Sequence, residues 1–138
     1  MKHSATANLG LLLMRAMLAA VFIYHGQYKF FSGIQGFSAY LEGLGVPLPL
    51  LAAWVSALTE LLCGVVLLAG VAFRLALWPL VFNMLVASFT AHAGKFDVRS
   101  EGMEYPLTLA VMVAGLALVG AGDWTLPGLL ARDEEDQR

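Results

Sequence analysis

Four long apolar segments occupy most of this 138-residue chain, and they constrain its fold more than any other feature. A helix needs about 20 mostly apolar residues to cross the hydrocarbon core of a bilayer. The segments that approach or reach this length are residues 8–28, 50–69, 73–91 and 105–121. Because the connections between them are short, consecutive helices should run antiparallel. The sequence predicts an all-α fold, a membrane-spanning antiparallel four-helix bundle over residues 1–126.

Charged residues are too few for a soluble protein of this length. Asp, Glu, Lys and Arg make up 13% of the chain, against about 25% in soluble domains. The formal net charge of −2 provides no basic surface for nucleic acid. The single cysteine, Cys63, excludes a disulfide within the chain and a cysteine-rich metal site. We therefore expect the lipid bilayer as the main partner, and no nucleic acid.

The residues between and after the spans also predict local structure. The longest connection is rich in Gly and Pro, and its middle, residues 37–42, is typical of a short amphipathic helix at the membrane interface. Pro79 should kink the third span. Residues 127–138 end in a charged run, which predicts an acidic, solvated tail.

The distribution of Lys and Arg gives an orientation. Four crossings place both termini on one side of the membrane, and that side carries slightly more basic residues than the other. The positive-inside rule then predicts cytoplasmic termini for a multi-pass membrane protein. Arg15 interrupts the first apolar segment and no small-residue cleavage site follows, so we expect an uncleaved helix and not a signal peptide.

Two opposite charges lie inside predicted spans, where ionisable groups are costly and therefore candidates for function. Arg15 belongs to the first span and Glu60 to a small-residue face of the second. Counted from the helix ends on one membrane side, at His25 and Leu50, each lies about 15 Å deep. We expect Arg15 and Glu60 to form an ion pair near the midplane. A catalytic pair and a structural lock on helix register are equally compatible with this pattern.

The remaining polar residues gather at the membrane side opposite the termini. Together they predict a polar cavity that opens toward that side and has the Arg15–Glu60 pair as its floor. The side chains expected around it are His25, Lys29, His92, Glu104, Tyr105 and Thr108. In the simpler interpretation, Lys29 and Glu104 mark the water interface and the two histidines bond backbone carbonyls.

The order and spacing of these residues resemble the DoxX family of membrane proteins. The matching positions are Arg15, His25-Gly26 with Lys29, Leu44-Gly-Val-Pro-Leu-Pro49, Glu60 with Gly64, His92, and Met103-Glu-Tyr-Pro106. The resemblance extends from about residue 11 to residue 126. Relatives often carry an aromatic residue where this chain has Met103, so the entrance to the fourth span departs from the pattern.

The resemblance implies a redox-linked inner-membrane protein, which suggests that the cavity binds a quinone-like molecule and takes part in its reduction with a redox partner protein. A quinone needs an apolar slot, hydrogen-bond donors at its oxygens and proton donors within reach. The residues assigned to catalysis are Arg15, Glu60, His92 and Glu104. Those assigned to binding of the head group are His25, Lys29, Tyr105 and Thr108.

Other functions fit the same sequence. His25 and His92 would also suit a metal ion or the axial positions of a haem. A non-enzymatic scaffold for a redox partner, or a small-solute transporter, would need none of this chemistry. The lipid-facing surface would also support a homo-oligomer.

Overall fold

The computed structural model describes residues 3–71 and 73–136, and its secondary structure there is helical without strands. This confirms the all-α prediction. The helices are α1 (Ala5–Ser32), α2 (Ile34–Gly43), α3 (Pro49–Ala69), α4 (Phe73–Ala76), α5 (Trp78–Phe89), the 3-10 turn η1 (Val98–Ser100), α6 (Glu104–Val119) and α7 (Leu126–Asp136).

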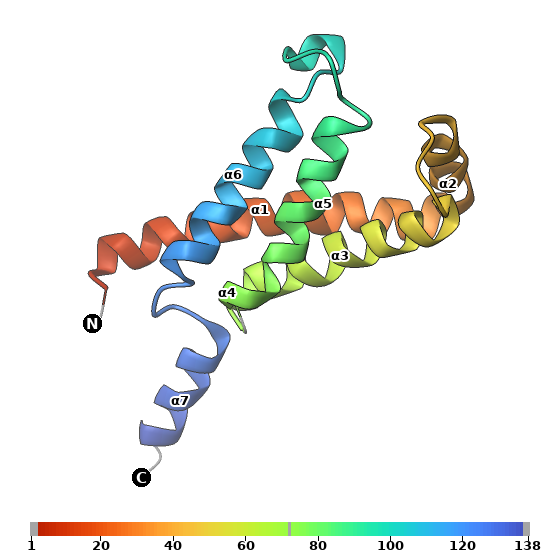
Figure 1. Cartoon of the computed structure of the whole chain (residues 1–138). Helices are drawn as coiled ribbons and strands as arrows, with labels where there is room; N and C mark the ends of the chain where they lie inside the picture. Colours follow the sequence, from red (N-terminus) through yellow and green to blue (C-terminus); the bar gives the residue numbers. More distant parts are fainter. Residues whose placement is uncertain (1–2, 72, 137–138) are drawn as a thin grey trace.

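The two longest helices, α1 and α3, lie side by side and antiparallel (Figure 1). Glycines let their backbones touch: a Cβ atom on Gly26 would lie 2.7 Å from the backbone nitrogen of Leu61. A Cβ on Gly64 would lie 2.8 Å from the side chain of Ile23. Both helices are long and apolar enough to cross a membrane. The 28 residues of α1 extend over about 42 Å, more than a bilayer core of about 30 Å.

Helices α5 and α6 form a second antiparallel pair, which crosses the first pair in Figure 1 instead of running along it. Their apolar segments, Phe73–Phe89 and Glu104–Val119, are shorter than α1 and α3. The first of these is broken just before Pro79, with α4 ending at Ala76, as the missing N–H of proline requires. The apolar helices therefore form two crossed pairs, and a bundle with one common axis is not observed.

The core lies where the two pairs meet. Its most completely buried large apolar side chains are Phe22, Leu67, Leu77, Leu80 and Val113. The predicted short helix around residues 37–42 is confirmed as α2. Within the segment expected to be a solvated tail, the residues up to Asp136 belong to helix α7 (Leu126–Asp136), whose Leu129 and Leu130 are exposed.

Candidate functional site

A cavity of about 570 Å³ lies between the two crossed helix pairs and is bordered by α2. Most of its lining is apolar, with Phe22, Val55, Phe82 and Leu109 among the contributors. The polar side chains that line it are His25, Lys29, Tyr40, Ser56, Thr59, Glu60, Asn83, Thr90, His92 and Tyr105. An apolar chamber with a few converging polar groups is typical of small-molecule sites.

Glu60 is the buried charge of this cavity, with 1% of its surface exposed. Its Oε1 accepts hydrogen bonds from Lys29 Nζ at 2.7 Å and from Asn83 Nδ2 at 3.2 Å. Its Oε2 is buried and has no hydrogen-bond partner among the described residues. A buried acceptor without a partner is unfavourable, so this oxygen is available to a molecule in the cavity.

Lys29 brings α1, α2 and α3 together. Its ammonium forms the ion pair with Glu60 and lies 4.7 Å from the ring centroid of Phe37 on α2. The negative face of an aromatic ring attracts a cation at this distance. The positive charge is thus held between a carboxylate and a ring, and α2 closes this side of the cavity.

His92 and His25 both line the cavity, but only His92 has a fixed orientation. His92 Nδ1 lies 2.6 Å from the backbone oxygen of Glu101. A carbonyl only accepts hydrogen bonds, so Nδ1 carries the proton and Nε2 of the neutral ring is an acceptor. His25 is exposed and packs edge-on against Tyr24, with ring centroids 5.6 Å apart.

The predicted pair between Arg15 and Glu60 is wrong. The Arg15 guanidinium donates to four backbone oxygens, those of Leu67 at 2.8 Å, Leu68 at 2.7 Å, Ala121 at 2.8 Å and Trp124 at 2.9 Å. It therefore satisfies carbonyls at the end of α3 and in the connection between α6 and α7, where the negative end of the helix dipole favours a cation. Arg15 does not line the cavity.

The error has a geometric cause. The expected depths of Arg15 and Glu60 require the first helix to end near His25, level with Leu50. The helix continues to Ser32, and Gly26 lies against Leu61. The antiparallel register is therefore shifted, which brings Arg15 to the last turn of α3 and Lys29 to Glu60.

Two further candidates, Glu104 and Thr108, also lie outside the cavity lining. Glu104 Oε2 accepts from the backbone N–H of Val98 at 3.0 Å, and the Thr108 hydroxyl donates to the backbone oxygen of Glu104 at 2.7 Å. Glu104 therefore stabilises the connection between α5 and α6, whereas the Thr108 bond lies within the first turns of α6. In that connection, hydrogen bonds from the side chain and then the backbone of Arg99 hold the pKa of Asp97 below its ordinary value.

Sequence reasoning missed the roles of Asn83 and Phe37. Asn83 shares a face of its helix with Thr90, and an amide on that face is the signal that could have suggested a partner for Glu60. The paired glycines, Gly26 and Gly64, could have given the correct register, because each marks a close approach of the partner helix.

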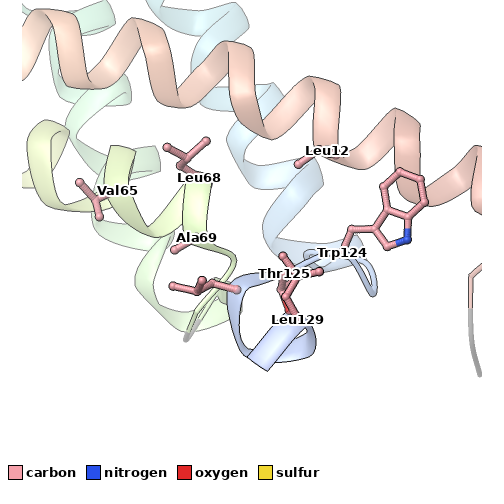
Figure 2. Close-up of a pocket in the computed structure, with 8 residues that line it drawn as sticks. Leu12, Val65, Leu68, Ala69, Trp124, Thr125 and Leu129 are labelled. Carbon is pink, nitrogen blue, oxygen red and sulfur yellow. The ribbon is translucent and has the colours of Figure 1, made fainter. Parts of the chain in front are cut away.

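A second hollow, of about 620 Å³, lies at the other end of α3 (Figure 2). Its walls come from α1, α3 and the start of α7, with Trp124 beside α1. It is lined by Leu12, Val65, Leu68, Ala69, Trp124, Thr125, Leu126 and Leu129. No titratable side chain is among them, so the chemistry concentrates in the cavity around Glu60. In the described ranges, no three His, Cys, Asp or Glu residues cluster to hold a metal.

A protein-family model described as DoxX matches residues 10–93, which is more than half of the chain. The matched region contains Arg15, Lys29, Glu60 and His92, and it ends before α6. No curated protein and no solved structure matches the chain.

Proposed function

The chain belongs to the DoxX family of integral membrane proteins, and on this premise we propose that its cavity binds a quinone-like molecule within the membrane. The observation that carries the proposal is the unpartnered, buried Oε2 of Glu60 in a largely apolar cavity. Ligand pockets usually enclose about 300–1,000 Å³, and this cavity is within that range. Its apolar walls suit an aromatic ring, while its few polar atoms orient the ring oxygens.

The polar groups also suit the chemistry of quinone reduction. Conversion of a quinone to a quinol takes up two electrons and two protons and forms two O–H bonds. In this proposal a redox partner protein supplies the electrons. Protonated Glu60 gives one proton to a ring oxygen, and Lys29 and Asn83 stabilise the carboxylate that remains. His92 gives the second proton from Nε2 and returns to the neutral form, with Nδ1 still bonded to Glu101.

The proposal includes a membrane arrangement. We propose that all four apolar segments cross the inner membrane, with the shorter two accommodated by local thinning of the bilayer. The termini then lie in the cytoplasm. Helix α2 and the connection between α5 and α6 lie on the opposite side.

Co-purified quinone tests this function. The protein is transferred from membranes into lipid nanodiscs, and quinone is extracted and quantified against empty nanodiscs. We expect retained quinone in the parent and a large loss in Ala87→Phe, because Ala87 lines the cavity and a ring there would occupy space that the ligand needs. Leu62→Phe is the matched control, since Leu62 is exposed on α3 and does not line the cavity. Parent protein with no quinone above the empty-disc background would overturn the proposal.

A further inference from the structure

We propose that the cavity recognises its ligand as a hydrogen-bond donor, and therefore binds the quinol form more tightly than the quinone. This inference rests on the proposed function and adds which member of the redox couple the site prefers. The two forms share size and apolar surface, but their oxygens differ. A quinol hydroxyl donates a hydrogen bond, whereas a quinone carbonyl only accepts one.

Once Glu60 and His92 have given up the two protons of the proposed reduction, as in the ion-paired form of Glu60, the fixed polar atoms available to the ligand are acceptors. Glu60 Oε2 is buried and unpartnered among the described residues. His92 Nε2 is an acceptor in the neutral ring, because Nδ1 donates to the Glu101 carbonyl. A quinol hydroxyl can donate a hydrogen bond to either atom. A quinone oxygen cannot, because it and the carboxylate oxygen are both acceptors and their lone pairs repel. Leaving such a buried acceptor unpaired is unfavourable.

The strongest donors of the cavity are already engaged. Lys29 Nζ and Asn83 Nδ2 both donate to Glu60 Oε1, and the Lys29 ammonium also lies against the Phe37 ring. Ser56, Thr59, Tyr40 and Tyr105 contribute hydroxyl groups, which both donate and accept. The ring of His25 likewise offers one donor and one acceptor nitrogen when neutral, so none of these groups distinguishes the two forms. The discrimination therefore depends chiefly on Glu60.

A preference for quinol changes the redox behaviour of the bound ligand. Tighter binding of the reduced form raises the reduction potential of the bound couple, by about 30 mV for each tenfold difference in affinity of a two-electron couple. Bound quinone is then a better electron acceptor than free quinone. The site would therefore favour electron transfer from the partner protein to the bound quinone.

Anaerobic calorimetry tests the preference directly. A short-chain benzoquinone and its quinol are titrated separately into the protein in nanodiscs. We expect the quinol to bind at least tenfold more tightly than the quinone, and a potentiometric titration of the bound couple to show the corresponding rise of about 30 mV. Equal affinities, or tighter binding of the quinone, would overturn the inference and leave the proposed function intact. Absence of binding by both forms would overturn the two proposals together.

Glu60→Gln supplies the sharper test. The amide oxygen of glutamine can accept the bonds from Lys29 and Asn83, which leaves its NH₂ donor toward the cavity in place of Oε2. We expect the preference to shift at least tenfold toward the quinone. Glu42→Gln removes the same charge from an exposed site at the end of α2, outside the cavity lining, and should leave the preference unchanged. A Glu60→Gln protein that keeps the parent preference would contradict the assignment.

Discussion

Two buried charges of this membrane protein are stabilised in different ways. Glu60 is neutralised by an ammonium and receives a second bond from an amide, within a cavity. Arg15 faces no carboxylate among the described residues, and it donates instead to backbone oxygens of two chain segments. Its guanidinium carbon also lies 5.6 Å from the ring centroid of Phe73. The first arrangement leaves an oxygen free for chemistry. The second closes the ends of helices and is structural.

The structural role of Arg15 predicts the effect of Arg15→Lys. An ammonium group cannot reproduce the planar fork that reaches Leu67, Leu68, Ala121 and Trp124 together. Bonds to charged donors contribute about 1.5–3 kcal/mol each, so we expect the free energy of unfolding to fall by about 2 kcal/mol or more. Reversible unfolding in mixed micelles measures this loss.

The matched control for that variant is Arg74→Lys. Arg74 donates one bond, to the Val119 oxygen at 3.2 Å, at an exposed position, so a change of about 0.5 kcal/mol or less is expected. Quinone retention should be unaffected in Arg15→Lys protein that is still folded. If Arg15→Lys protein were as stable as the parent but retained no quinone, Arg15 would have a role in ligand binding after all.

For individual residues, the sequence indicated which charged side chains are buried, but it did not indicate which groups they bond. Charge within an apolar span correctly indicated that Arg15 and Glu60 are buried. Their partners depend on helix register, and an error of a few residues changes which side chains meet. Residues that bond backbone carbonyls, as Arg15 does, are also hard to foresee, because every helix end offers the same acceptors.

At the scale of elements, the contact between α1 and α3 sets the geometry of the site. The close approach at Gly26 brings the backbone of α1 against Ala57, one turn before Glu60, and Leu61, directly after it. Lys29 lies one turn beyond Gly26 and reaches the same carboxylate. The glycine contact and the ion pair therefore fix the same register.

Gly26→Ala should weaken this contact. Its Cβ would lie 2.7 Å from the backbone nitrogen of Leu61 and 3.1 Å from the oxygen of Ala57, and neither atom can move without shifting α3. Overpacking of this kind destabilises by about 1–3 kcal/mol, and we expect a loss in that range by unfolding in mixed micelles. Gly10→Ala on the same helix meets nothing within 4 Å and should not destabilise. Equal stability of the two variants would show that α1 and α3 do not pack as described.

The elements themselves were largely predictable, because apolar length and helix breakers are local properties. The short helix α2 and the break before Pro79 follow from such signals. The first helix extends beyond its expected limits at both ends, where Ser4 accepts from Ala7 and the residues up to Ser32 remain helical. The crossing of the two pairs depends on contacts distant in sequence, which apolar length alone does not encode.

At the scale of the whole molecule, the polar ends separate into two groups. Figure 1 places both termini toward one end of the structure, whereas α2 and the connection between α5 and α6 lie away from them. A reciprocal contact joins the two terminal regions, with Asn8 Oδ1 accepting from the Asp123 N–H at 2.7 Å and Asn8 Nδ2 donating to the Asp123 carboxylate at 3.1 Å. This arrangement suits a chain whose termini share one membrane face.

Labelling of single cysteines with a membrane-impermeant maleimide tests that arrangement. Ser4→Cys and Ala131→Cys probe the terminal side, and Glu42→Cys and Lys95→Cys probe the other, all at exposed positions. In spheroplasts we expect reaction at residues 42 and 95 alone, and at all four positions after the membrane is opened. The parent chain is the unlabelled control, because its Cys63 is buried and lies 3.2 Å from the Ala76 oxygen. Reaction at residues 4 and 95 from the same side would mean an even number of crossings between them, instead of the three proposed. One of the short apolar segments would then lie within the interface, and the cavity around Glu60 would be nearer to water than proposed.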